Sequence, residues 1–214
     1  MEVDEKGTKT VMVSLYPKLA QDDDEDIYTE MIFIVDRSGS MAGSRMQQVK
    51  DTLHIFLRSL GEGTQFNIIG FGSRTQHLFP SGSVEYNDKC VRHTRRTRRT
   101  RHIRHTSTTA KRGLFYFRNL ELATKHVDQM FANLGGTDIL KPLTEVLRQP
   151  PKEGYPRQLF ILTDGEVNNT QECIQFVRKH ADTTRVFTFG VGNEASQDLV
   201  KGLAKAGVRS FLLP

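Results

Sequence analysis

The sequence predicts an α/β fold in which a doubly wound, mostly parallel sheet carries helices on both faces. Two stretches, Met31–Val35 and Leu159–Leu162, are apolar at every position, which is typical of strands buried on both faces of a parallel sheet. Amphipathic stretches with helical spacing separate the apolar runs. Strands that alternate with helices favour a parallel sheet with right-handed crossover connections.

The first half of the chain supplies predicted strands at residues 30–35, 64–72 and 77–79. Between the first two strands, residues 44–60 place apolar side chains at helical spacing, so we expect a long helix there. Ser44 is the expected N-cap and Gly61 the expected end of this helix. The third strand is short and is closed by a turn at residues 80–82.

The second half of the chain continues the alternation. Helices are predicted at residues 120–130, 139–148, 170–181 and 196–206, and strands at residues 157–163, 185–192 and 209–213. In the helix at 170–181, Cys173, Ile174 and Val177 share one face, and Gly207 ends the last helix. Residues 30–214 are therefore predicted to form one domain.

An N-terminal extension of residues 1–29 precedes this domain. Residues 11–17 are either a short strand or the tail of a preceding domain, and residues 22–26 are five consecutive acids. Like charges repel one another, which favours a solvated linker. A calcium loop is disfavoured because its glycine and its ligand spacing are missing.

Residues 88–118 are predicted to be an arginine-rich, low-complexity insertion in a surface loop. Residues 92–106 form five triplets, and a period of three matches neither a helix nor a strand. Residues 89–118 hold eleven Lys and Arg and no acid, so the remaining 19 basic and 25 acidic residues are mildly acidic despite the overall charge of +5. The tract is either native or translated simple-repeat DNA kept by a faulty gene model.

Bulk composition disfavours several classes of protein. No apolar run approaches the roughly 20 residues that span a membrane. The polar N-terminus has no apolar core of signal-peptide length, so a cytoplasmic location is expected, with secretion left open if the chain continues upstream. Cys90 and Cys173 are far apart, which predicts neither a disulfide framework nor a zinc site.

Side chains that carry oxygen follow apolar stretches or lie in adjacent loops at three separate places. They are Asp36, Ser38, Ser40, Thr137 and Asp164. The carboxyl ends of parallel strands meet at one edge of a sheet, so these side chains can converge. Two carboxylates and three hydroxyls are hard ligands that suit Mg²⁺, Mn²⁺ or Ca²⁺ rather than zinc or copper. With only two acids the ion keeps positive charge, which the carboxylate of a partner could neutralise.

Each of these positions also has a purely structural interpretation. Ser38 and Ser40 could cap the helix that follows, and Thr137 could cap the helix that begins near residue 139. Asp164 followed by glycine is an ordinary turn signal. The metal site is favoured because three separate segments place oxygen ligands at the same sheet edge.

The sequence motifs in these segments resemble those of a known family. Residues 36–40 (Asp-Arg-Ser-Gly-Ser), 135–137 (Gly-Gly-Thr) and 163–165 (Thr-Asp-Gly) resemble the metal-ion-dependent adhesion site (MIDAS) of von Willebrand factor A domains. The resemblance covers about residues 30–212, interrupted by residues 88–118. It implies a Rossmann-like, six-stranded sheet with one short antiparallel edge strand, and metal-dependent protein binding without catalysis.

The same resemblance assigns roles within the site. Ser38, Ser40 and Thr137 would contact the ion directly, and Asp36 and Asp164 would do so directly or through water. The wording is most similar to the branch that includes the intracellular type-5 members. There a β-rich VIT domain precedes the A domain, and residues 11–17 would be its last remnant. The arginine-rich insertion and the absence of a final helix depart from the family pattern.

We therefore expect a module that binds an acidic side chain of a protein partner through Mg²⁺. An Mg²⁺-dependent phosphoryl-transfer enzyme is one alternative, but it needs a second acid where Ser38 and Ser40 stand, and no Lys or His lies beside the motifs as a base. Nucleic-acid binding by the seven arginines of residues 92–104 is another. No aromatic residue lies between those arginines to stack on bases, so weak polyanion binding is the simpler expectation.

Overall fold

The computed structural model describes residues 28–86, 119–165, 167, 169–192 and 195–207, and the backbone of residues 2–3 and 9–10. The strands of the main sheet are β3 (Glu30–Asp36), β4 (Gln65–Phe71), β5 (Thr75–His77), β6 (Val84–Glu85), β7 (Arg157–Thr163) and β8 (Thr184–Gly190). Helices are η1 (Gly39–Met41), α1 (Ser44–Ser59), α3 (Leu140–Leu147), α4 (Thr170–Lys179) and α5 (Gln197–Ala206), and residues 119–128 are also helical. A separate antiparallel pair joins β1 (Glu2–Val3) and β2 (Lys9–Thr10).

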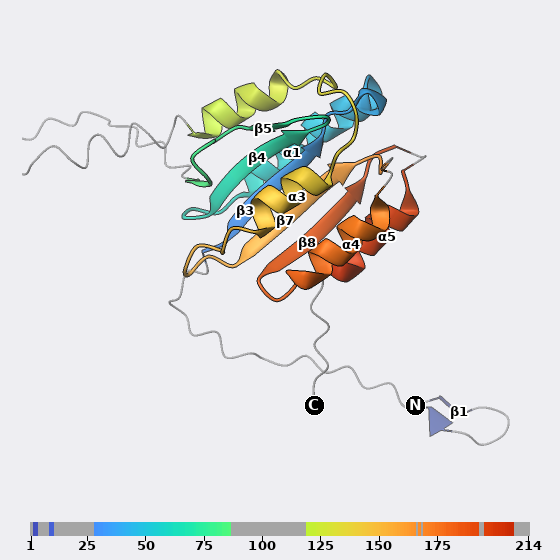
Figure 1. Ribbon diagram of the computed structural model, residues 1–214. Helices are drawn as coiled ribbons and strands as arrows, with labels where there is room; N and C mark the ends of the chain where they lie inside the picture. Colours follow the sequence, from blue (N-terminus) through green and yellow to red (C-terminus); the bar gives the residue numbers. More distant parts are fainter. Residues whose placement is uncertain are drawn as a thin grey trace, which may run out of the picture.

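The main sheet has the strand order β5-β4-β3-β7-β8 (Figure 1). Strand β6 pairs with β4. Strand β3 lies parallel to β4 and β7, and β8 lies parallel to β7. Among the described strands of this sheet, only the short strands β5 and β6 run antiparallel to their neighbour β4. This arrangement confirms the predicted mostly parallel sheet with a short antiparallel edge strand.

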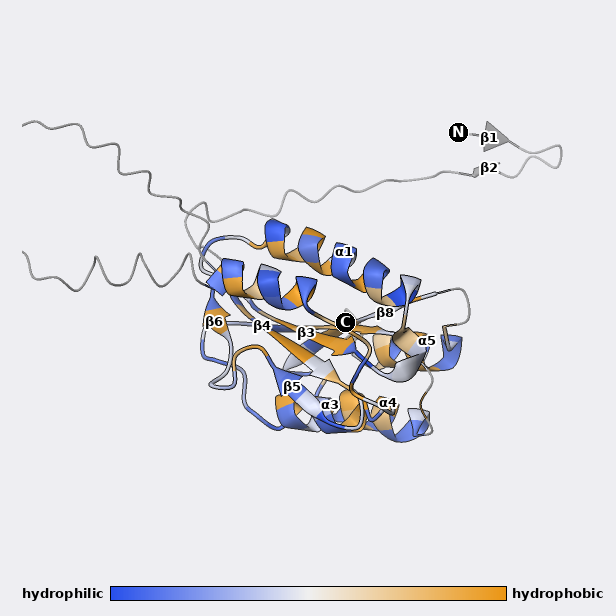
Figure 2. Ribbon diagram, turned by 90° about the horizontal axis from the view of Figure 1, so that it is seen from above, coloured by the Kyte–Doolittle hydropathy of each residue, from blue (hydrophilic) through white to orange (hydrophobic). Residues whose placement is uncertain are grey.

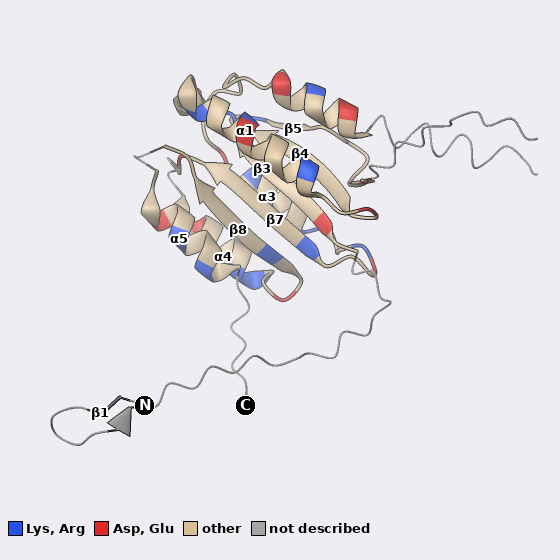
Figure 3. Ribbon diagram, turned by 180° about the vertical axis from the view of Figure 1, so that it is seen from behind, with Lys and Arg blue, Asp and Glu red and all other residues tan. Residues whose placement is uncertain are grey.

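The helices cover the two faces of the sheet in two layers (Figure 2). Helix α1 and the helix at residues 119–128 pack on one face, over Phe33, Val35 and Ile68. Helices α3, α4 and α5 pack on the other face, over Ile32, Ile34 and Ile161 among others. Among the described residues, the charged ones lie mostly on the helices and near the strand ends (Figure 3). The alternate side chains of β3 thus feed both cores, which explains its uninterrupted apolar run.

Several local details differ from the prediction, two of them with a clear physical reason. Gly43, with a φ of 78°, takes the N-cap position of α1, and the predicted cap Ser44 is its first helical residue. The predicted strand at 77–79 lies two residues earlier, as β5. It ends there because the Asn67 side chain accepts the Phe79 N–H and donates to the Phe79 carbonyl, which takes the place of ladder hydrogen bonds.

Several predictions fall outside the described residues: the strand at 11–17, the acidic run at 22–26, the insertion at 88–118 and the strand at 209–213. Within the part of the chain that is described, no helix is long and apolar enough to cross a membrane. The cytoplasmic location stays a prediction.

Candidate metal site

The end of β3 delivers a buried carboxylate into a tight turn. Asp36 is fully buried and Ser38 almost so. The Asp36 Oδ1 atom accepts the Ser38 N–H at 2.9 Å, and the Ser38 Oγ lies 3.0 Å from the Ser40 Oγ, in the short helix η1. The turn therefore holds one carboxylate and two hydroxyls close together, as the sequence predicted.

The end of β7 brings the second carboxylate to the same edge. Thr163 Oγ1 donates to the Asp36 Oδ2 at 2.6 Å and accepts the Gly165 N–H at 2.9 Å. Asp164 follows Thr163 directly and is 2% exposed. Because β3 and β7 are adjacent parallel strands, their carboxyl ends lie side by side. Thr163 had no assigned role, although it precedes Asp164 in the Thr-Asp-Gly wording.

The loop that carries Thr137 is joined to the same turn through its backbone. The Gly39 N–H donates to the Gly135 carbonyl, and the Leu134 N–H donates to the Arg37 carbonyl, each at 3.0 Å. Thr137 itself is partly exposed. Among the described residues, no hydrogen bond joins its side chain to the other four predicted ligands. The structure therefore places the Thr137 loop beside the turn through backbone hydrogen bonds.

Arg37 anchors the loop before Thr137 through its side chain. Its guanidinium donates to the Phe131 carbonyl at 2.9 Å, and to Gln76 Oε1 and Asn133 Oδ1 at 2.7 Å each. The side chain is 4% exposed, so this is a buried, charge-assisted anchor. The sequence offered no signal for this role beyond the position of Arg37 between two motif residues.

Arg45 brings a cation to the site. Its Nη1 atom donates to the Ser40 carbonyl at 3.0 Å and lies 3.2 Å from the Asp164 Oδ2. The sequence motifs assign no role to Arg45, which is neither a Lys nor a His. The signal that could have revealed it is a basic residue in the first turn of a helix, where cations are disfavoured.

The electrostatics of the site fit a hard cation. Burial raises the pKa of the Asp36 carboxyl, hydrogen bonds from Ser38 and Thr163 lower it, and the charge of Asp164 raises it further. Two carboxylates that repel one another in a buried place are stabilised by a bound cation. No group of three or more His, Cys, Asp or Glu side chains in the described ranges could hold a metal. Any ion here would therefore depend on the serine and threonine hydroxyls as well as the two acids, and this donor set suits Mg²⁺ or Mn²⁺.

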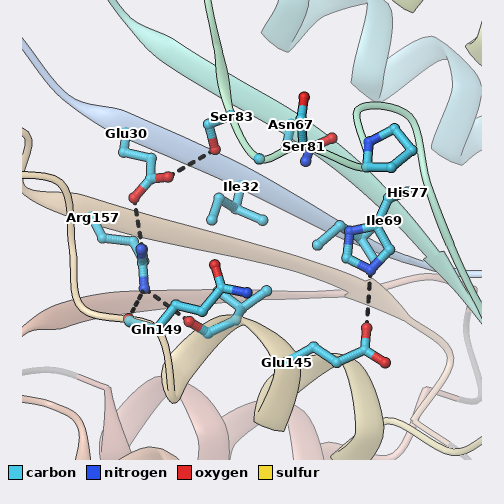
Figure 4. A pocket seen from close by; sticks show the side chains of 13 residues that line it. Glu30, Ile32, Asn67, Ile69, His77, Ser81, Ser83, Glu145, Gln149 and Arg157 are labelled. Carbon is cyan, nitrogen blue, oxygen red and sulfur yellow. Dashed lines mark hydrogen bonds and ion pairs between the residues drawn. The ribbon is translucent and has the colours of Figure 1, made fainter.

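Apart from this site, a hollow of about 150 Å³ lies between α3 and the strands β3 and β4 (Figure 4). It is lined by a buried ion pair, in which Arg157 Nε lies 2.7 Å from the Glu30 Oε2. His77 Nε2 lies 2.9 Å from the Glu145 Oε2 across the same hollow. These polar groups pair with one another, so a structural role explains the polar lining of the hollow.

Comparison with solved structures identifies the fold. A von Willebrand factor type A protein from Catenulispora acidiphila superposes with a TM-score of 0.61 at 17% identity, over 84% of this chain and 37% of that one. Proximal thread matrix protein 1 from the mussel byssus, described with a zinc-occupied MIDAS motif, gives 0.56 at 18% identity over 84% and 42%. The manganese-loaded TRAP protein of Plasmodium vivax gives 0.54 at 17% identity over 84% and 63%.

Closer relatives exist among curated proteins. Human von Willebrand factor A domain-containing protein 5B1 is 41% identical over 175 residues, which are 82% of this chain and 12% of that protein. A von Willebrand factor A domain-containing protein of Dictyostelium discoideum is 36% identical over 195 residues, 91% of this chain and 18% of that protein. The chain thus spans less than a fifth of the length of these two relatives. Type-5 proteins are among the matches, as the wording of the motifs predicted.

The family profile described as von Willebrand factor type A domain matches residues 29–114 and 116–208. Domains of this family are commonly metal-dependent protein-interaction modules and are generally non-enzymatic. Neither a phosphoryl-transfer activity nor nucleic-acid binding gains support from these comparisons. The match over most of the chain, together with relatives above 30% identity, shows that the chain belongs to the von Willebrand factor A domain family.

Proposed function

We propose that this domain binds a divalent cation, Mg²⁺ in the cell, and through it a carboxylate of a protein partner. Asp36, Ser38, Ser40, Thr137 and Asp164 are the proposed ligands. The observation that carries the proposal is the pair of buried carboxylates at neighbouring strand ends, beside two hydroxyls 3.0 Å apart. The zinc and manganese named for two proteins of the same fold add support. Bound Mg²⁺ would offer an open coordination position to the carboxylate of the partner.

Features of the site favour binding over catalysis. Asp36 is fully buried and bonded through both oxygens, so it is poorly placed to attack a substrate. The nearby cation is an arginine, which stays protonated and so cannot accept a proton as a general base. We infer that the site holds a ligand and does not turn it over.

The surface beside the site also suits a protein partner. An open hollow of about 390 Å³ lies between the start of α1 and the loop before Thr137, lined by Ala42, Met46, Lys50 and Phe131 among others. The Phe131 side chain is 61% exposed, and the Lys50 Nζ lies 4.8 Å from its ring centroid. The Phe131 backbone is anchored by Arg37. Exposed aromatic residues on a fixed backbone are frequent anchors in protein interfaces.

The test is direct cation binding, measured by titration calorimetry with Mn²⁺, together with partner capture from lysate with and without EDTA. Thr137→Val removes one proposed ligand without losing a described hydrogen bond, and Asp36→Asn removes a charge at nearly constant shape. We expect each to lower Mn²⁺ affinity at least about tenfold, since one ligand oxygen is lost, and to abolish EDTA-sensitive capture.

Asp51→Ala is the matched control, because Asp51 is an exposed carboxylate on α1 bonded to Gln47. Circular dichroism should show all variants folded. Undiminished Mn²⁺ binding in folded Asp36→Asn and Thr137→Val would refute the metal site.

A further inference from the structure

Arg45 sets a permanent positive charge against one of the two carboxylates of the proposed site. Its Nη1 atom lies 3.2 Å from the Asp164 Oδ2 and donates to the Ser40 carbonyl at 3.0 Å. The Asp164 side chain is 2% exposed and that of Arg45 is 24% exposed. The guanidinium thus bridges the turn after β3 and the end of β7, the two segments that carry four of the five proposed ligands.

Local helix chemistry does not explain a cation at this position. Arg45 is the second residue of α1, whose first turn contains no acid. The amino end of a helix carries partial positive charge, so a basic side chain there is disfavoured. Its contact with Asp164 offsets this cost. The position of Arg45 is therefore explained by the carboxylate and not by the helix.

The loop after β8 leaves room for this guanidinium. A Cβ atom at Gly192 would lie only 2.9 Å from the Arg45 Nε. Any larger residue at 192 would press on the side chain near its charged end. Arg45 is thus held between the site turn, the end of β7 and the backbone that follows β8.

We propose that Arg45 is an internal counter-cation of the metal site, which neutralises Asp164 and competes with the divalent ion for that carboxylate. The inference rests on the proposed function, because it concerns the affinity of the same site. The Arg45 guanidinium and the divalent ion would both bind oxygens of Ser40 and Asp164, and their positive charges repel one another. Arg45 therefore keeps cation affinity below the value that the ligand oxygens alone would give.

The expected size of the effect follows from Coulomb's law. A singly and a doubly charged cation about 5 Å apart repel by enough to weaken binding on the order of tenfold even in a water-like dielectric. Arg45→Met keeps the length of the side chain and removes the charge, so it should bind Mn²⁺ about tenfold more tightly than the unaltered chain. Arg45→Lys keeps the charge and should stay within about threefold of it.

The experiment is calorimetric titration of the full chain and these variants with Mn²⁺, in parallel with thermal unfolding with and without the ion. Arg58→Met is the matched control, because Arg58 is an exposed arginine in the last turn of the same helix. It changes the net charge equally and should leave affinity unchanged. The rise in Tm on adding Mn²⁺ should be larger for Arg45→Met than for the unaltered chain, because tighter binding stabilises the folded state more.

Three results are decisive. Unchanged or weaker Mn²⁺ binding by Arg45→Met, while the unaltered chain binds the ion, would overturn the role of Arg45 and leave the metal site standing. Equal tightening by Arg58→Met would also overturn it, since net charge would then explain the effect. Absence of Mn²⁺ binding in every variant would overturn the metal site and this inference together.

Discussion

Removal of the Arg37 anchor should weaken both the fold and the proposed metal site. Arg37→Met keeps an unbranched side chain of similar length but loses three hydrogen bonds from a charged donor, to Phe131, Gln76 and Asn133. Hydrogen bonds to charged groups contribute about 1.5–3 kcal/mol each. Simple addition would give an upper bound of about 4.5–9 kcal/mol, and bonds that share one partner do not add.

The exposure of the partners lowers this estimate. Gln76 and Asn133 are exposed residues, so their amide oxygens can accept from water when Arg37 is lost. The main uncompensated loss is the tie between the end of β3 and the backbone of Phe131. We therefore expect the free energy of unfolding to fall by about 2–4 kcal/mol. Mn²⁺ affinity should fall about tenfold, because the loop that carries Thr137 is then less fixed.

Urea unfolding followed by circular dichroism measures the first effect, and calorimetry below the unfolding transition measures the second. Arg148→Met, at an exposed arginine after α3, is the matched control and should change stability by less than about 0.5 kcal/mol. An Arg37→Met protein with unaltered stability would refute the anchoring role. A destabilised variant with unaltered Mn²⁺ affinity would show that the anchor serves the fold alone.

Two further predictions concern buried charge and pH. Glu30→Gln should lower the free energy of unfolding by about 3 kcal/mol, because it leaves the buried guanidinium of Arg157 without its counter-ion. Urea unfolding measures this effect, with Glu153→Gln as the exposed control. Equal stability of the two variants would contradict the prediction. Burial, followed by the charge of Arg37, lowers the pKa of His126 from its usual 6.5. The unfolded chain therefore binds this proton first, and stability should fall as pH drops below about 6.5. His126→Asn should reduce the difference in unfolding midpoint between pH 7.5 and 5.5, and an identical pH dependence would count against the assignment.

The sequence by itself determined the core of the fold because the relevant signals are local. The apolar run before Asp36 and the run before Asp164 each predict a strand that is covered by helices on both faces. The end of each run also predicts where its strand ends. Parallel strands put their carboxyl ends at one edge. It follows from these local patterns alone that the two acids and the two serines share that edge, and the structure has them there.

The short edge elements were less predictable, because their extent depends on neighbours. Strand β5 ends at His77 because both backbone groups of Phe79 are hydrogen-bonded to the side chain of Asn67. Asn67 lies twelve residues before Phe79 in the chain. Strand β6 consists of two residues paired with the start of β4, too short to give an alternating pattern. The cap of α1 moved by one residue because glycine adopts the positive φ of that position readily.

Only the tertiary structure decided which side chains support the site. Arg37 binds the Phe131 carbonyl 94 residues away, Arg45 meets Asp164 at a separation of 119, and Thr163 meets Asp36 at a separation of 127. No pattern within a window of sequence records such pairs. They exist because crossover connections bring β7 beside β3 and set the loop before Thr137 against the turn after β3. The types of the proposed ligands were thus readable from the chain, whereas the side chains that support the proposed site depend on how distant strand ends meet.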